Sequence, residues 1–246
     1  MQLMVASPVE LYASDESLEL SGVSLPYDPE IITPDIHRAI SDGTFEAEES
    51  TRIGEIVRPG DRVLEIGAGI GFMSTLLSRE RRVASVVAVE ANPYLIDYME
   101  RVHATNGVKK VRRMNAVLTN EPVASRTFYL RRDFWMGSLL PGPNPWLDTV
   151  SVPTLNFDAL LRDEAISLIV CDVEGAEAFL FEDVALDGVD RIFVELHDHV
   201  TGLSGVGSLF RTLAAKGFVY DPRHSAGSVI LFQHVGGRDI IRPYAG

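Results

Sequence analysis

A short apolar segment that runs into three closely spaced glycines constrains this chain more than any other feature. Residues 61–66 read Asp-Arg-Val-Leu-Glu-Ile, and glycines follow at positions 67, 69 and 71. The segment is β-rich and bounded by turn residues, which is typical of a buried parallel strand, and a helical pattern begins at Phe72. Glycines let the intervening turn bend tightly and let a ligand approach the backbone, while the N–H groups of the next helix point toward that ligand. We therefore expect a strand, a turn and a helix that together bind a nucleotide-like ligand.

The spacing of the glycines argues against a dinucleotide. A dinucleotide fingerprint has the pattern G-x-G-x-x-G, and counting from Gly67 places Phe72 where the third glycine should stand. The carboxylate of Glu65, two residues before the first glycine, would repel a pyrophosphate but attract the ammonium and sulfonium of S-adenosylmethionine. A second apolar segment ends in Glu90, the place of the acid that bonds ribose hydroxyls in nucleoside-binding folds. The paired acids predict S-adenosylmethionine as the cofactor, and a plain tight turn is the alternative.

The composition fits one large α/β domain. The chain has 246 residues, a length that suits one domain rather than two full ones. Of these residues, 46% are hydrophobic, which is enough for a packed core. No apolar run approaches the roughly 20 residues of a membrane span, and the first twenty residues lack the pattern of a signal peptide. Cys171 is the only cysteine, so no internal disulfide can form, and a reducing, cytoplasmic location is expected.

The net charge excludes several classes of partner. Lysine and arginine total 22 against 35 acids, which gives a net charge of -13. DNA, RNA and anionic membranes are therefore poor candidates, and short basic pairs such as Arg131 and Arg132 are expected to be solvated. The expected partner is a small-molecule acceptor, and the sequence makes no prediction of the oligomeric state.

The chain divides into two predicted parts. Residues 1–57 are expected to form an arm and helices that cover the cofactor cleft, and residues 58–246 to form the cofactor-binding domain. Prolines at positions 8, 26, 29 and 34 predict that residues 1–35 are irregular. One helix of the first part is expected to have Thr44 as its N-cap. It would bring Glu46 or Glu49 to the methionine ammonium of the cofactor, and a charged helix surface is the alternative.

The middle of the chain contains two candidate ligand contacts. Asn115 follows a third predicted strand, where its amide could bind the adenine edge, and a plain loop cap is the alternative. Residues 123–152 begin β-like and then lose periodicity, which predicts a long loop. The loop contains Trp135 and Trp146, which would either line an acceptor pocket or pack on the surface.

Polar residues follow two further predicted strands, residues 168–171 and 191–194. Asp172 comes directly after the first strand, and Glu195 and His197 come after the second. Alternation places Glu195 and His197 on the same side. Open α/β sheets bind their ligands at the carboxyl ends of their strands, so this edge is the expected site.

Together these residues resemble the FkbM-type methyltransferases, a family within the class I enzymes that use S-adenosylmethionine. The similarity extends over residues 43–232, and its most specific element is the pattern D-x-E-G-x-E at residues 172–177. Glu65 stands where the family commonly has aspartate, so the charge is kept. The other matching segments are GTFE at 43–46, PGD at 59–61, LEIGAGIG at 64–71, VEANP at 89–93, NA at 115–116 and VELH at 194–197.

The resemblance implies a fold and a reaction. The implied fold is a Rossmann-like α/β sheet of seven strands, mostly parallel with one antiparallel strand, with helices on both faces. The implied reaction is methyl transfer, usually to a hydroxyl of a small molecule, sugar or natural product. The residues implied for the cofactor are Glu65, Gly67, Ala68 and Gly69 at the methionine end, Glu90 and Ala91 at the ribose, Asn115 and Ala116 at the adenine, and Asp172 at the sulfonium, with Glu46 added from the covering helix.

The catalytic residues are predicted to be His197, Asp172 and Glu195. Neutral His197, oriented by an acid such as Glu195, would accept the proton of the acceptor hydroxyl. A structural histidine paired with Asp198 is the alternative. Asp172 is the rival base, although its expected role is electrostatic.

Three other readings stay open. Asp172, Glu195 and His197 could instead converge on a divalent metal, although the usual paired acid and amide ligands are not evident and no metal is predicted. The fold could also serve as a non-catalytic binding or scaffold module. A nucleotide-dependent oxidoreductase is the remaining alternative.

Overall fold

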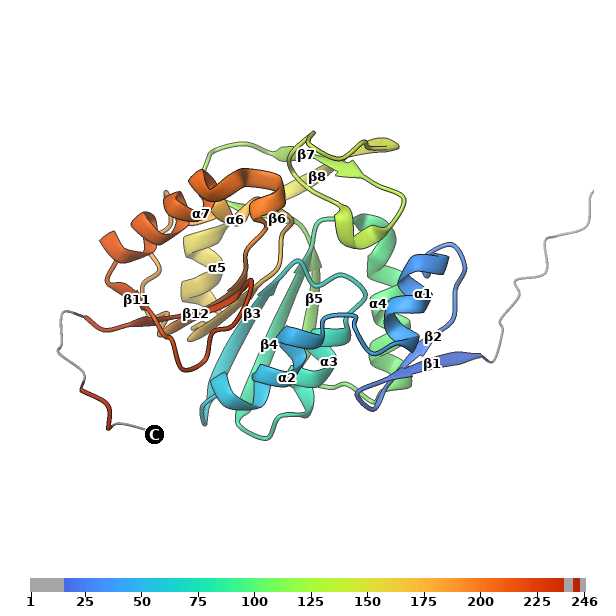
Figure 1. Ribbon diagram of the computed structural model, residues 1–246, viewed down its shortest axis with the longest axis horizontal. Helices are drawn as coiled ribbons and strands as arrows, with labels where there is room; N and C mark the ends of the chain where they lie inside the picture. Colours follow the sequence, from blue (N-terminus) through green and yellow to red (C-terminus); the bar gives the residue numbers. More distant parts are fainter. Residues whose placement is uncertain (1–15, 237–240, 244–246) are drawn as a thin grey trace, which may run out of the picture.

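A computed structural model describes residues 16–236 and 241–243, and its centre is a seven-stranded sheet (Figure 1). The strand order is β11-β12-β10-β9-β3-β4-β5. Only β12 runs antiparallel to its neighbours β10 and β11, while the remaining pairs are parallel, so the predicted fold is confirmed. The strands are β3 (Asp61–Ile66), β4 (Val83–Glu90), β5 (Val111–Asn115), β9 (Leu168–Cys171), β10 (Arg191–Glu195), β11 (Phe218–Tyr220) and β12 (Val229–His234).

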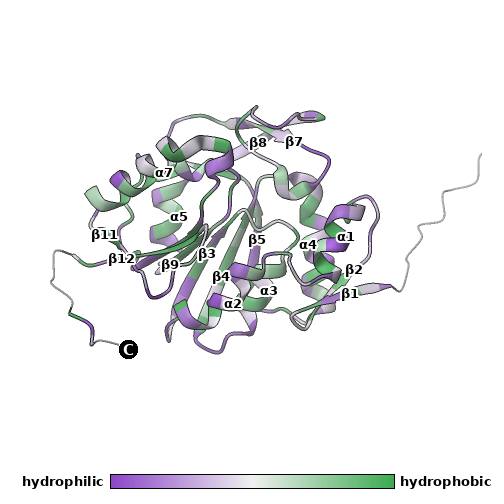
Figure 2. Cartoon of the chain, in the orientation of Figure 1, coloured by the Kyte–Doolittle hydropathy of each residue, from purple (hydrophilic) through white to green (hydrophobic). Residues whose placement is uncertain are grey.

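The register of the strands places the candidate residues at one edge. Ile66 pairs with Cys171, and Cys171 pairs with Val194. The parallel strands therefore end side by side, and the residues that follow them meet at the carboxyl edge of the sheet. Strand β4 is hydrophobic over most of its length (Figure 2) and β9 is apolar throughout, as expected for strands covered on both faces.

Helices cover both faces of the sheet. Buried residues of α2 and α3 pack on one face, and buried residues of α5 and α7 pack on the other. The helices are α1 (Pro34–Ser41), α2 (Ala47–Ile56), α3 (Phe72–Arg79), α4 (Ile96–Thr105), α5 (Phe157–Asp163), α6 (Glu177–Leu180) and α7 (Asp198–Ala215), with a single 3-10 turn, η1 (Pro93–Leu95), before α4. Within the described ranges, no helix is both long enough and apolar enough to cross a membrane.

The segment before the sheet is more regular than expected. Residues 16–35 were expected to be irregular because of their prolines, yet they contain a hairpin of β1 (Ser17–Leu20) and β2 (Val23–Pro26). This hairpin and α1 share a core cluster with α3 and α4. The rest of the predicted arm, residues 1–15, lies outside the described residues, and the boundary at residue 57 stays a prediction.

The predicted N-cap of α2 is wrong. The Thr44 hydroxyl donates to the Ala39 carbonyl at 3.3 Å, so it caps the end of α1 instead. Glu46 occupies the N-cap position with a left-handed φ of 45°. This backbone conformation is unfavourable for a residue with a Cβ, and such residues concentrate at functional sites.

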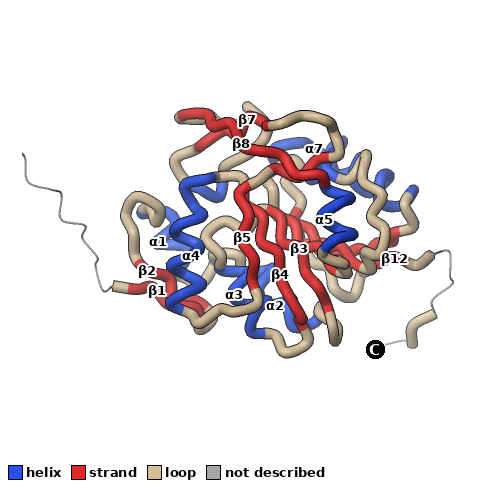
Figure 3. The backbone as a smooth tube through the Cα atoms, turned by 180° about the vertical axis from the view of Figure 1, so that it is seen from behind, coloured by secondary structure: helices blue, strands red, loops and turns tan. Residues whose placement is uncertain are grey.

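The two ends of the predicted long loop are strands of a second, smaller sheet. It has the order β6-β8-β7 and lies across the carboxyl edge of the central sheet, where the tube in Figure 3 shows β7 and β8. Its strands are β6 (Val117–Thr119), β7 (Ser125–Leu130) and β8 (Asp148–Asn156), and a 3-10 turn, η2 (Phe134–Met136), lies in the connection between β7 and β8.

Candidate active site

A cleft with about 780 Å³ of empty space lies at the carboxyl edge of β3, β4 and β9. Most of the residues predicted to bind the cofactor line it. They are Glu46, Gly67, Gly69, Glu90, Ala91, Ala116 and Asp172. Three aromatic side chains from the smaller sheet and its connection also line it: Phe128, Phe134 and Trp135.

The glycine turn is tight for a reason the sequence did not show. A Cβ on Gly67 would lie 1.7 Å from the carbonyl oxygen of Asp172, so the glycine allows two chain segments to approach rather than a ligand. A Cβ on Gly69 would lie 3.6 Å from Phe134, on the side of the cleft. Both glycines have positive φ, 83° and 51°, which L side chains rarely adopt. Ala68 packs with Ala88 and Met99 instead of lining the cleft.

Glu90 holds the turn in place. One carboxylate oxygen accepts a hydrogen bond from the Gly69 N–H at 2.8 Å, and the other accepts from the Asn92 N–H at 2.6 Å. Burial raises the pKa of Glu90, although these hydrogen bonds oppose the shift. The carboxylate is thus fixed on the wall of the cleft at the end of β4, where a ribose hydroxyl could donate to it.

Asn115 supports the same loop. Its amide donates to the carbonyls of Glu90 and Ala91, at 2.9 and 3.0 Å, which corresponds to the loop-cap alternative. The residue is not among those that line the cleft. Its contact with adenine stays a prediction.

Glu65 lies deeper, on a small cavity with about 350 Å³ of empty space. The side chain is buried, and its Oε2 atom has no hydrogen-bond partner in the described part of the chain. Burial raises the pKa of Glu65 to about 8; Ser74 opposes this shift, and Glu90 and Asp172 add to it. Glu46, Glu49, Asp172 and Glu195 line the same cavity. An unpaired buried carboxylate oxygen is costly, and the ammonium of a methionine moiety would satisfy it.

A second cavity, with about 1180 Å³ of empty space, adjoins the cleft. The two share Glu46, Trp135, Asp172 and Glu174. Six carboxylates and two histidines line the second cavity, and its lining of described residues contains neither lysine nor arginine. Trp135 stacks on Phe45 with ring centroids 6.1 Å apart, so one predicted loop tryptophan lies at a candidate acceptor pocket.

The connection that carries Trp135 is held by a buried arginine. Arg131 was expected to be solvated, but its side chain folds inward. Its guanidinium donates to the carbonyls of Met136 at 2.9 Å and Leu140 at 3.0 Å. The expectation failed because the carbonyls of an irregular segment replaced water as hydrogen-bond acceptors.

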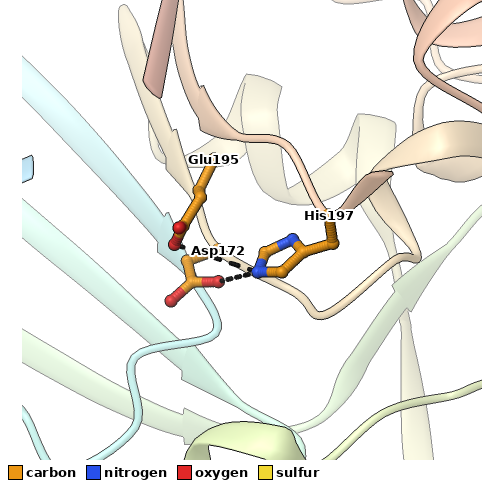
Figure 4. Close-up of side chains that lie close together, drawn as sticks. All are labelled: Asp172, Glu195 and His197. Atoms are coloured by element: carbon orange, nitrogen blue, oxygen red, sulfur yellow. Dashed lines mark ion pairs between the residues drawn. The ribbon is translucent and has the colours of Figure 1, made fainter. Parts of the chain in front are cut away.

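The structure brings the three predicted catalytic side chains together. The Nε2 atom of His197 lies 3.3 Å from Asp172 Oδ1 and 3.8 Å from Glu195 Oε2 (Figure 4). One donor atom from each residue lies within 4.8 Å of the others. The cluster lies on the wall of the second cavity, and Asp172 belongs to both spaces.

Glu177 is a site residue to which the sequence assigned no role. Its two oxygens accept from the N–H groups of Gly175 and His197, each at 2.8 Å. One of them also lies 3.4 Å from His197 Nδ1. The last acid of the D-x-E-G-x-E pattern therefore holds the backbone of His197 and lies beside its ring, and the position of this acid in the motif was the available signal.

The surrounding carboxylates favour a protonated histidine. Burial alone would lower the pKa of His197, but Glu177, Asp172 and Glu174 outweigh burial and raise it to about 10. Burial raises the pKa of Asp172 to about 7, although His197 opposes that shift. The free protein thus carries a proton on this cluster. The predicted base role of His197 requires a neutral ring, so it stays a prediction.

Comparisons with known proteins place the chain in a family. Residues 65–220 match the methyltransferase FkbM domain, and no curated protein matches. Similar solved structures include TYW2 from M. jannaschii in complex with AdoMet, at 14% identity and a TM-score of 0.44, covering 89% of this chain and 86% of that one. TrmK from M. capricolum in complex with S-adenosyl-homocysteine is 5% identical, with a TM-score of 0.46 and coverage of 76% and 68%. A protein of the NADB-Rossmann superfamily from Streptococcus agalactiae is 13% identical, with a TM-score of 0.46 and coverage of 75% and 67%.

The family match extends over more than half of the chain, from the acid of the glycine strand to the end of β11. It includes the D-x-E-G-x-E motif and the cluster at the ends of β9 and β10. The chain belongs to the FkbM family of S-adenosylmethionine-dependent methyltransferases.

Proposed function

We propose that this methyltransferase transfers the methyl group of S-adenosylmethionine to a hydroxyl oxygen of a small molecule, sugar or natural product. One observation carries the proposal: the cofactor cleft and the second cavity meet at Asp172, beside His197 and Glu195. A methyl group presented from one space would face an acceptor held in the other.

The cofactor would lie along the cleft with its cationic end toward the acids. Glu90 would accept hydrogen bonds from the ribose, and Ala91 and Ala116 would contact the nucleoside. Glu65 and Glu46 would attract the methionine ammonium, which supplies the partner that Glu65 Oε2 lacks. The bound cofactor supplies the electrophilic methyl group.

The cluster would prepare the acceptor. In the transfer, the acceptor oxygen forms a bond to the methyl carbon, the carbon–sulfur bond breaks, and its electron pair stays on the sulfur. A hydroxyl must also lose its proton, whereas a neutral amine can attack without losing one first. Carboxylates beside the junction support oxygen as the methylated atom because they can accept a hydrogen bond from a hydroxyl and take up its proton.

The charge of the second cavity limits the acceptor. Six carboxylates without a lysine or arginine in the lining repel phosphates and carboxylates. The proposal therefore includes a neutral or cationic small acceptor, no nucleic acid and no anionic membrane surface. The cytoplasmic location stays a prediction from the sequence.

Two measurements test this function. Calorimetric titration should detect binding of S-adenosylmethionine and of its demethylated product, and binding of a nicotinamide dinucleotide instead would favour the oxidoreductase alternative. Labelled S-adenosylmethionine should then transfer label to hydroxyl acceptors. Full cofactor affinity without transfer to any hydroxyl, carboxyl or amine in a broad screen would favour the scaffold alternative.

A further inference from the structure

We propose that Asp172, Glu195 and His197 form a binding site for one divalent metal ion at the junction of the two cavities. The site itself is inferred from the geometry of these residues. Its part in catalysis rests on the proposed function, because the ion would bind the acceptor hydroxyl.

The spacing of the donor atoms fits a single ion. Three donors from three residues lie within 4.8 Å of one another, and the pair formed by His197 Nε2 and Asp172 Oδ1 is 3.3 Å apart. Metal bonds of about 2.0–2.3 Å place neighbouring donors roughly 3 Å apart and opposite donors roughly 4–4.5 Å apart. Glu174 Oε1, 3.7 Å from the same nitrogen, is a possible fourth donor. Small rotations of the side chains would therefore complete the coordination.

The buried histidine ring is directed at the site. The His197 side chain is 5% exposed, and Figure 4 shows the Nε2 edge of the ring directed at Asp172 and Glu195. Its Nδ1 has no hydrogen-bond partner among the described residues and faces Glu177 on the other side of the ring. A proton held on Nδ1 would leave the Nε2 lone pair for an ion between the two carboxylates.

Glu177 completes the arrangement behind the ring. A metal-binding histidine almost always directs its other nitrogen at a carboxylate, a carbonyl or a water, which fixes its tautomer and orientation. Glu177 lies 3.4 Å from His197 Nδ1 and also accepts from the His197 backbone N–H at 2.8 Å. Closing the 3.4 Å contact into a hydrogen bond would leave Nε2 with its lone pair toward the ion.

The donor set selects the kind of metal. One imidazole with two carboxylates suits Mn²⁺, Fe²⁺ or Zn²⁺ better than Ca²⁺, which prefers oxygen donors alone. Open coordination positions would face the second cavity. There the ion would bind the acceptor hydroxyl, lower its pKa and release its proton to solvent, and the resulting oxygen would attack the methyl carbon with the ion unchanged.

A titration with Mn²⁺ tests the site directly. The full-length protein is stripped with a chelator, and the loss of the EPR signal of free Mn²⁺ is followed as protein is added. We expect one saturable site, and Asp172→Asn, Glu195→Gln and His197→Ala should each weaken it at least about 10-fold. Glu48→Gln removes a carboxylate from the same cavity and should leave Mn²⁺ affinity unchanged. Thermal unfolding of each variant checks that it folds.

The outcomes separate this proposal from the proposed function. No saturable Mn²⁺ binding, or binding equally tight in folded His197→Ala and Asp172→Asn variants, would overturn the metal site. Methyl transfer that survives exhaustive chelation would overturn its catalytic part and leave the methyltransferase intact. Specific Mn²⁺ binding in a protein that methylates no hydroxyl would support the site and contradict the proposed function.

Discussion

Replacing Glu90 with alanine should lower the affinity for the cofactor more than it lowers the stability of the fold. The carboxylate accepts two backbone hydrogen bonds, from Gly69 and Asn92, and is proposed to accept another from the ribose. A hydrogen bond to a charged group contributes about 1.5–3 kcal/mol. Loss of the ribose contact should therefore raise the dissociation constant of S-adenosylmethionine about 10- to 150-fold. Stability should fall less, because the smaller side chain admits water to the two freed N–H groups.

Isothermal titration calorimetry at one temperature and salt concentration measures this change. Glu55→Ala is the matched control because it removes a largely exposed carboxylate of α2 that does not line the cleft. The control should bind like the parent protein. Urea unfolding of both variants separates a lost contact from a lost fold. A folded Glu90→Ala protein with an unchanged dissociation constant would remove Glu90 from the site.

Three further predictions follow from specific contacts. Asp172→Asn should lower the affinity for S-adenosylmethionine at least about 10-fold but the affinity for its demethylated product much less, because only the former carries the sulfonium charge. Equal losses of affinity in calorimetry would contradict a position of Asp172 beside the sulfur. Glu177→Gln should lower the affinity for Mn²⁺ about 10- to 100-fold in the EPR titration, while the affinity for the cofactor stays the same. Unchanged Mn²⁺ binding would show that Glu177 does not position the histidine. Asp61→Asn should destabilise the fold by about 3–5 kcal/mol in urea unfolding, because it breaks the buried pair with Arg191, which is 2.5 Å away.

The same buried pair makes stability depend on pH. Burial alone would raise the pKa of Asp61, but the hydrogen bonds from Arg191 hold it below the ordinary value of 3.8. A carboxyl group whose pKa is lower in the folded state stabilises the fold above its ordinary pKa. This stabilisation should be lost as the pH falls through the folded-state value. Urea midpoints measured from pH 6 to 3 should drop more steeply for the parent protein than for Asp61→Asn. If the midpoints of both proteins fell in parallel, the pH dependence would not come from Asp61.

The convergence of the site was predictable because it follows from strand topology. Asp172 and Glu195 each stand at the end of a short apolar run, and parallel strands end at a common edge. The glycine turn was predictable too, although the reason for Gly67 differs: the missing Cβ makes room for the backbone of Asp172 rather than for the ligand.

The features that the sequence did not reveal depend on how irregular segments fold. Arg131 is buried only because the connection between β7 and β8 curls its carbonyls around the guanidinium. Thr44 caps the preceding helix because its hydroxyl reaches the carbonyl of Ala39 across the turn that follows α1. The role of Glu177 depends on a neighbour 20 residues away, His197. Local propensity does not encode such pairings.

Transfer of a labelled methyl group would demonstrate O-methylation itself. The protein is incubated with S-adenosylmethionine carrying a ¹³C methyl group and with a library of neutral and cationic polyols, and the products are examined by NMR. We expect a labelled methyl ether whose formation is strongly reduced in Asp172→Asn and His197→Ala proteins that still fold. A label on nitrogen or carbon, or a methyl ether formed at the parent rate by both variants, would contradict this expectation.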